Sequence, residues 1–291
     1  MIETKEILKL SQKKRYIPFS EKNVPIRMDG IFKIVMGNPA NQKYLKEFLE
    51  AILHRKIYGI LFVETEKLLL KAKEENKDMK LDLVVQFENG EIVDVEIQNA
   101  KEKELFERSV AYSVGILYND YNKTDKYNKG KKTIIWILDY NFLPNSTKYH
   151  EIFTYKNEDA SQEISLLEQH FIQLPLFIEQ IKEIKTEEEK WLAYFSGQLN
   201  EEELKGVYKM SRSIEEINEI VDAVMNDPDV AYALEARRRK NIDMYFAKKE
   251  QLEEVAEKMI KKNKPIEEIV EFTGLSKEII EKLQKEIKEV N

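Results

Sequence analysis

The segment LDLVVQFENGEIVDVEIQ, residues 81–98, carries acidic side chains in a pattern that could do chemistry. It predicts two strands around the turn residues 88–90, and successive side chains of a strand point to opposite faces. Asp82 therefore lies on the polar face of the first strand, and Glu96 and Gln98 share the polar face of the second. Two neighbouring carboxylates are oxygen ligands for a hard cation such as Mg²⁺. Such an ion activates water and neutralises charge on a phosphodiester.

The length of the turn determines whether these carboxylates meet. A two-residue turn at Asn89-Gly90 would pair Asp82 with Ile97 and put carboxylates beside apolar residues. A three-residue loop, residues 88–90, pairs Asp82 with Glu96, with Cβ atoms about 4.5–5.5 Å apart. That loop needs Gly90 in the left-handed conformation, and we expect this form. The alternative is that the acidic residues are simply the solvated face of an antiparallel sheet.

The rest of the chain predicts the elements that position this pair. Residues 1–24 read as an N-terminal arm and residues 25–200 as an α/β core. Asp29 is expected to cap the first helix, residues 102–118 form another, and the apolar strand 134–138 should be central. Residues 201–291 predict a helical C-terminal extension that ends in a helix-turn-helix-like tail around residues 273–275.

Composition excludes several classes of protein. The 291 residues have no cysteine, which excludes disulfides, thiol catalysis and cysteine-zinc sites. No two glycines are two residues apart, so nucleotide-binding glycine motifs are missing. The three histidines are scattered, and we expect ordinary surface or core roles for them. No signal peptide or membrane span is expected, and we expect a cytoplasmic protein without a small-molecule cofactor.

The order and spacing of these residues resemble the Rpn-type recombination-promoting nucleases, a transposase-like family of the PD-(D/E)xK nuclease superfamily. The resemblance covers residues 25–200, and a helical tail like residues 265–283 is also typical of it. The residues that carry it are Asp29-x₂-Phe32-Lys33, Asp82, Glu96-Ile97-Gln98 and Arg108-x₃-Tyr112.

The resemblance implies a restriction-endonuclease-like mixed β-sheet flanked by helices, and a DNA endonuclease that depends on Mg²⁺ or Mn²⁺ and is linked to recombination or mobile elements. Asp82 and Glu96 match its metal-binding acids, and Asp29 matches an additional acidic position. Arg108 and Tyr112 lie one turn apart on a helix and can point at the same site. This sequence departs from the superfamily pattern because Leu81 replaces the proline of the motif.

The second departure is more serious, because Gln98 stands where the superfamily usually has lysine. Glutamine cannot supply a cation, so more of the work would pass to the metal and to Lys101, Lys103 or Arg108.

Two further segments are expected to contact partners. The loop 119–132 predicts a phosphate-binding strip interleaved with tyrosines, although it also fits an ordinary solvated loop. Its lysines are Lys123, Lys126, Lys129, Lys131 and Lys132. The last helix carries a heptad stripe that includes Ile280 and Leu283, suited to a neighbouring helix or to a homodimer. A catalytically inactive DNA-binding or assembly protein, and a hydrolase of RNA, are the competing interpretations.

Overall fold

The computed structural model describes residues 7–10, 16–18, 25–70, 79–119 and 130–290. The chain divides into two compact units, Met1–Met225 and Asn226–Asn291. The boundary was expected after residue 200, whereas the two units divide after Met225. The reason is that α6 (Glu201–Met210) and α7 (Arg212–Met225) pack with the first unit, where α6 contacts α5 and α7 contacts α1 and α2.

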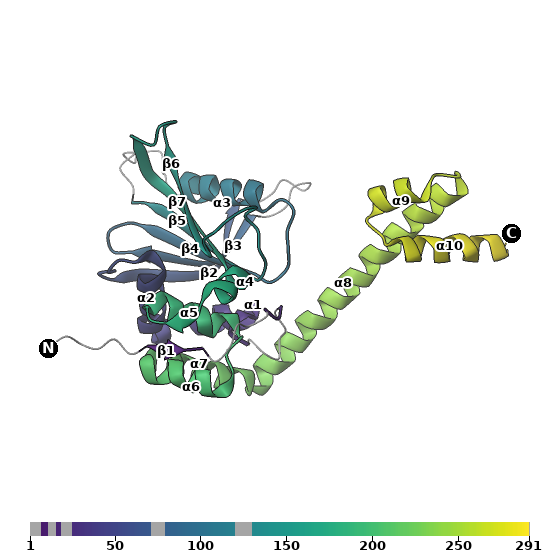
Figure 1. Cartoon of the computed structure of the whole chain (residues 1–291). Coiled ribbons are helices and arrows are strands. Elements are labelled where there is room, and N and C mark those ends of the chain that lie inside the picture. The colour runs from purple at the N-terminus through teal and green to yellow at the C-terminus, as the bar shows by residue number, and fades with distance from the viewer. Residues whose placement is uncertain (1–6, 11–15, 19–24, 71–78, 120–129, 291) are drawn as a thin grey trace. The chain divides into compact units, whose positions relative to one another are not determined.

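A six-stranded mixed sheet forms the centre of the first unit, in the order β2-β3-β4-β5-β7-β6 (Figure 1). The strands are β2 (Ile60–Leu70), β3 (Met79–Phe87), β4 (Ile92–Gln98), β5 (Lys132–Leu138), β6 (His150–Lys156) and β7 (Glu163–Gln173). β5 pairs in parallel with β4 and β7, and the other pairs are antiparallel. Every residue of β5 is buried, which confirms the expected central strand. The predicted α/β fold with a helical extension is likewise confirmed.

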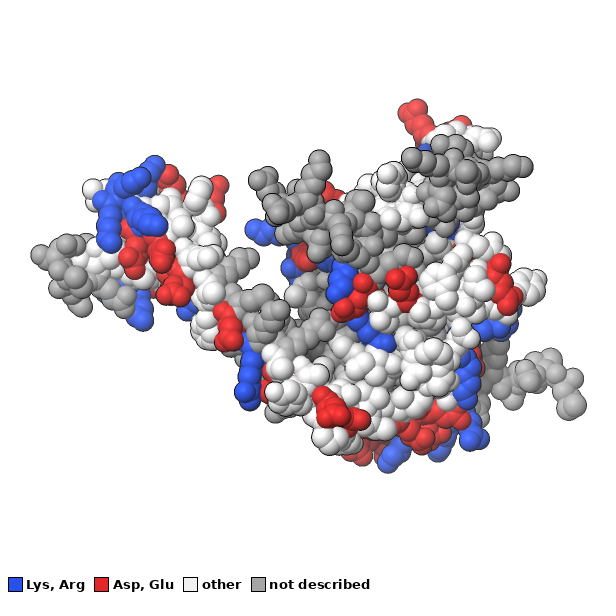
Figure 2. Space-filling view, turned by 180° about the vertical axis from the view of Figure 1, so that it is seen from behind, with Lys and Arg blue, Asp and Glu red and all other residues white. Residues whose placement is uncertain are grey.

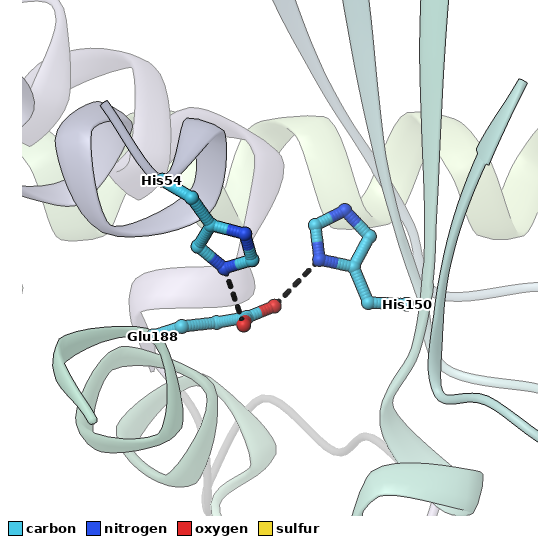
Figure 3. Close-up of side chains that lie close together, drawn as sticks. All are labelled: His54, His150 and Glu188. Atoms are coloured by element: carbon cyan, nitrogen blue, oxygen red, sulfur yellow. Dashed lines mark hydrogen bonds and ion pairs between the residues drawn. The ribbon is translucent and has the colours of Figure 1, made fainter. Parts of the chain in front are cut away.

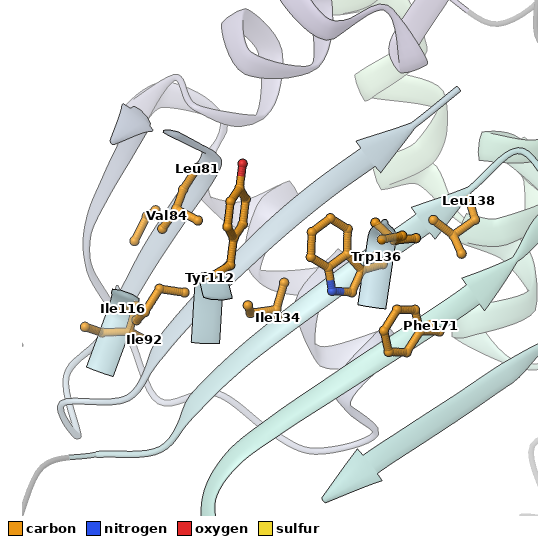
Figure 4. Packing of buried hydrophobic residues seen from close by; sticks show 10 residues of the cluster. Leu81, Val84, Ile92, Tyr112, Ile116, Ile134, Trp136, Leu138 and Phe171 are labelled. Carbon is orange, nitrogen blue, oxygen red and sulfur yellow. The ribbon is translucent and has the colours of Figure 1, made fainter. Parts of the chain in front are cut away.

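Helix α3 (Leu105–Asn119) packs on one face of the sheet. Figure 4 shows Tyr112 and Ile116 of this helix over side chains of the strands. The cluster buried between the helix and the sheet consists of Leu81, Val84, Ile92, Leu105, Tyr112, Ile116, Ile134, Trp136, Leu138 and Phe171. The face that carries Asp82 and Glu96 is therefore covered by a helix and is not the solvated side of the sheet.

Helices α1 (Asp29–Met36), α2 (Gln42–Leu53) and α5 (Glu187–Ser196) form a second layer. The ring of Phe48 lies 5.2 Å from that of Phe195 and 5.6 Å from that of Trp191, so aromatic packing joins α2 to α5. At the end of α1, Gly37 abuts Thr65 and Leu83, which places this end against β2 and β3. Short elements connect the layers, namely the 3₁₀ helices Pro25–Arg27 and Pro39–Asn41 and the helix α4 (Leu174–Gln180).

The predicted N-terminal arm is in part a strand. β1 (Leu8–Lys9) pairs with β8 (Glu183–Ile184), and Leu8 packs against Gly206 of α6. Further along, the Tyr16 hydroxyl donates a hydrogen bond to the buried Asp139, which also pairs with Arg27. The described parts of the arm are therefore attached to the first unit.

The second unit contains α8 (Pro228–Lys261), α9 (Ile266–Thr273) and α10 (Lys277–Val290). Asp227 caps α8, and Gly274 ends α9 in the left-handed conformation with a φ of 68°. Ile280 and Leu283 are buried within this unit, so this part of the heptad stripe packs on neighbouring helices. None of the described helices is both long and apolar enough to cross a membrane.

Candidate active site

The hairpin of β3 and β4 has the predicted register. Val84 pairs with Asp94 and Gln86 with Ile92, which continues to Asp82 beside Glu96. The Phe87 amide donates to the Glu91 carbonyl at 2.8 Å and closes a loop of three residues. Gly90 has a φ of +83°, a conformation that glycine adopts without steric cost. The turn chemistry therefore brings the two carboxylates together.

Asp82 and Glu96 meet at the edge of the buried core. The backbone amide of Asp82 donates a hydrogen bond to Glu96 Oε1 at 2.9 Å. The side chain of Glu96 is completely buried, whereas that of Asp82 is 23% exposed. One carboxylate is thus held inside the protein, and the other reaches solvent.

A third acid, Asp94, lies two residues before Glu96 and was not singled out in the sequence. Its side chain is fully buried, and neither of its oxygens has a hydrogen-bond partner among the described residues. Burial, together with the charges of Glu96 and Asp82, raises the pKa of Asp94 well above its ordinary value. Its alternation with apolar residues at spacing two, which places it on the face of Glu96, was the available signal.

Burial also perturbs Glu96 itself. Removal from water and the nearby charge of Asp82 raise the pKa of Glu96 to about 8, even though Arg108 acts in the opposite direction. A buried carboxyl with a strongly raised pKa in such a cluster is a mark of functional sites.

Arg108 and Tyr112 of α3 complete this side of the site. Arg108 donates to Glu96 Oε2 at 2.9 Å and to the exposed Glu102 at 2.8 Å. The guanidinium lies over the rings of Tyr112 and Trp136, at 4.9 and 5.5 Å from their centroids. The Tyr112 hydroxyl donates to the Lys80 carbonyl at 3.0 Å, and its oxygen can still accept a hydrogen bond.

Gln98 and Lys33 lie at the same carboxylates. The side-chain amide of Gln98 is 3.5 Å from Glu96 Oε2, a long contact. Lys33 of α1 forms an ion pair of 2.9 Å with Asp82, and its side chain is only 12% exposed. No role was predicted for Lys33, although it belongs to the motif of the resemblance and lies one helical turn after Asp29. Lys101 and Lys103, the lysines suggested instead, make no described contact with Asp82 or Glu96.

Helix α1 begins at Asp29 and its capping position is Met28, so the prediction that Asp29 caps the helix is wrong. The side chain of Asp29 lies outside what the structure describes, as do Lys123, Lys126 and Lys129.

The two remaining loop lysines lie at the start of β5. Lys131 pairs with Glu168 at 2.5 Å, and Lys132 is only 1% exposed. Lys132 is therefore removed from the phosphate-binding strip, because a buried ammonium cannot contact a nucleic acid on the surface. Figure 2 shows basic and acidic side chains intermixed over the face in view, in accord with the net charge of −7.

The donor set at Asp82 and Glu96 fits a hard divalent cation. Both residues offer carboxylate oxygens, and Mg²⁺ is commonly bound by one or two carboxylates together with water and substrate phosphate. Lys33 and Arg108 already pair with these two carboxyl groups. The site can therefore exchange one kind of cation for another without leaving a buried charge unpaired.

The comparison with protein families gives a match over most of the chain. A family model described as PD-(D/E)XK nuclease family transposase matches residues 26–251. Searches of curated proteins and of solved structures gave no match. The matched range contains β3, β4 and α3, and so includes every residue of the site described above.

Proposed function

The chain belongs to the PD-(D/E)XK nuclease family of transposases, and on this premise we propose that it is a metal-dependent DNA endonuclease that hydrolyses phosphodiester bonds at Asp82 and Glu96. The observation that carries the proposal is the completely buried Glu96 carboxyl beside the partly exposed Asp82. Carboxylates are rarely fully buried unless they are paired or have a function. A link to recombination or mobile elements is part of the same proposal.

Asp82 and Glu96 would hold Mg²⁺, or Mn²⁺ in its place, through their carboxylate oxygens. When bound, the ion lowers the pKa of a water molecule and neutralises charge on the phosphodiester. Asp94 is compatible with this arrangement, because its raised pKa favours the neutral acid, which adds no third negative charge to the site. The ligands are thus two, with the remaining positions left to water and phosphate.

Lys33 supplies the cation that the superfamily's lysine provides and that the neutral Gln98 cannot provide. Its ammonium lies 2.9 Å from Asp82, so a phosphate next to Asp82 would also lie within its reach. A fixed cation at this place stabilises the negative charge that develops on the phosphate in the transition state. Gln98 contributes its amide, which contacts Glu96 and can orient water. Asp29 is kept in the proposal as an additional acid on the same helix.

Arg108 is held by stacking on Tyr112 and Trp136, and it donates a hydrogen bond to Glu96. A guanidinium that is fixed in this way is suited to bidentate contact with a phosphate. When the metal binds Glu96, Arg108 can therefore exchange its contact with Glu96 for one with a phosphate oxygen of the DNA.

DNA is the proposed substrate, and the lysine loop is its proposed contact. Lys123, Lys126 and Lys129, together with Lys131, would bind phosphates, which predicts strong weakening of DNA binding by salt. Cleavage of both strands of a duplex calls for two active sites. We therefore infer a homodimer that forms through the helical extension.

One observation favours a second function. Lys33 and Arg108 occupy the carboxyl groups of Asp82 and Glu96 with ion pairs, which also fits a catalytically inactive DNA-binding or assembly protein. Cleavage assays separate the two functions.

The test is cleavage of supercoiled plasmid with Mg²⁺, Mn²⁺ or Ca²⁺ by wild type, Asp82→Ala and Glu96→Ala. Glu102→Ala is the matched control, because Glu102 contacts the same arginine from an exposed position. We expect nicking with Mg²⁺ or Mn²⁺ that the first two variants lose and the control keeps. A gel shift without cleavage by any form would establish the second function, and faster cleavage of RNA would reassign the substrate.

A further inference from the structure

All three histidines of the chain converge on one place, contrary to the sequence expectation of scattered, independent roles. His54 follows α2, His150 begins β6 and His170 lies in β7. The rings of His54 and His150 are 5.7 Å apart, and those of His150 and His170 are 5.0 Å apart. Sequence spacing could not reveal this cluster, because strand pairing and helix packing bring its members together.

Glu188, in the first turn of α5, joins two of these histidines (Figure 3). Its two carboxylate oxygens lie 2.7 Å from His54 Nε2 and 2.6 Å from His150 Nδ1. One potential ligand atom of each residue lies within 4.8 Å of those of the other two. Three elements that are distant in sequence thus present two imidazole nitrogens and one carboxylate to a common point.

We propose that His54, His150 and Glu188 form a binding site for a transition-metal ion of the Zn²⁺ class. Imidazole nitrogen favours such ions over Mg²⁺, and two histidines with one glutamate are an established ligand set for Zn²⁺. Three protein ligands leave the fourth position to water. Because the chain has no cysteine, no thiolate competes with these histidines for the ion.

The side chains behind His150 form the support that a metal-binding histidine needs. His150 Nε2 lies 2.8 Å from His170 Nδ1, and His170 Nε2 lies 3.0 Å from Glu168. The Glu168 carboxylate only accepts, so His170 donates to it through Nε2 and a neutral His170 ring accepts through Nδ1. His150 then donates through Nε2, as metal ligands do toward their support. Its Nδ1 faces the Glu188 carboxylate, so a proton on Nδ1 makes the hydrogen bond of 2.6 Å, and a metal ion bound by both atoms would take the place of that proton.

The site is open to ions from solvent. The His54 side chain is 56% exposed, while those of His150 and Glu188 are less than a tenth exposed. His54 lines a cleft of about 590 Å³ whose wall includes the acidic residues Glu47 and Glu187 and the basic residues Arg55 and Lys56. An ion from solvent would therefore meet His54 first, and the two buried side chains would complete the site.

The site is separate from the nuclease site. Across the sheet, Glu96 pairs with Trp136 and Trp136 with Phe171, which places these three on the α3 face. His170 precedes Phe171 and therefore points to the opposite face, and His150 shares that face with it. A metal here would join α2, α5 and β6, and we infer a structural clamp.

The first experiment is a Zn²⁺ titration of the full-length, chelator-treated protein by calorimetry, with Co²⁺ absorption as the spectroscopic readout. We expect one Zn²⁺ per chain, bands of four-coordinate Co²⁺, and loss of both in His54→Ala and Glu188→Gln. His170→Gln should weaken binding by about 10–100-fold through loss of support for His150. Fluorescence of the two tryptophans verifies that each variant is folded.

The matched control is the double variant Asp82→Asn, Glu96→Gln, which removes the nuclease acids and should bind Zn²⁺ as wild type does. Because the chain has only three histidines, ring ¹⁵N spectra report on this cluster alone. Zn²⁺ should shift Nε2 of His54 and Nδ1 of His150. Absence of stoichiometric binding, or binding that survives both His54→Ala and Glu188→Gln, overturns the proposal and leaves a network of ion pairs. Either result is independent of plasmid cleavage.

Discussion

Glu96→Gln should make the metal-free protein more stable at neutral pH, even though it removes a residue of the proposed active site. The folded chain raises the pKa of Glu96 from 4.5 to about 8, mainly through burial. Between these values the folded chain holds a proton that the unfolded chain has released. The free energy of unfolding therefore falls as the pH rises, and glutamine removes this dependence.

The slope sets the magnitude of the effect. One bound proton changes the free energy of unfolding by about 1.4 kcal/mol per pH unit. From about pH 6 to about pH 7.5, inside the window, wild type should lose about 2 kcal/mol relative to Glu96→Gln. Urea unfolding in chelator measures this difference. Trp136 and Trp191 are both buried in the first unit, so their fluorescence reports on that unit.

Glu102→Gln is the matched control for this experiment. Glu102 contacts the same Arg108, but its side chain is 46% exposed and remains hydrated. Its substitution should therefore change the stability equally at the two pH values. The prediction is refuted if the difference in stability between wild type and Glu96→Gln is also the same at the two pH values, because Glu96 would then be ionised in the folded chain throughout the window.

Three further predictions follow from contacts in the first unit. Lys33→Met should slow cleavage by about 10²–10³-fold, because it removes a preorganised charge. Lys80→Met, at a neighbouring exposed lysine, should leave the rate unchanged, and single-turnover kinetics compare the two variants. At high pH, Arg108→Met should lower the free energy of unfolding of the metal-free protein by about 3 kcal/mol, because the ionised Glu96 is left buried and unpaired. Urea unfolding measures this loss, and addition of Mg²⁺ should restore part of it. Gly130→Ala should lower the melting temperature more than Gly90→Ala, because a Cβ at Gly130 would lie 2.3 Å from the Gly90 backbone; equal shifts would contradict this packing.

The hairpin that carries the acids could be predicted because local rules determine it. The alternation of polar and apolar residues predicted the faces of the two strands. The odd number of residues in the loop, with Gly90 in the left-handed conformation, predicted their register. The apolar run of β5 predicted its central place in the sheet. Each of these features depends on residues within about ten positions of one another.

Tertiary packing determined what the sequence left open. Lys33 reaches Asp82 only because α1 lies against β2 and β3, a contact that no local pattern encodes. The coverage of Glu96 by α3 turned an apparently solvated face into a buried one. The histidine cluster depends on pairing of β6 with β7 and on docking of α5, so its members look unrelated along the chain.

The central claim is that Asp82 and Glu96 bind the metal that drives cleavage. Its most direct test counts bound Mn²⁺ by electron paramagnetic resonance in the His54→Ala background, where the second proposed site is removed, and measures duplex cleavage in the same samples. The account predicts one bound Mn²⁺ per chain and cleavage that saturates with it, with both lost in Asp82→Asn and in Glu96→Gln. Full Mn²⁺ binding or undiminished cleavage in these two variants would contradict it.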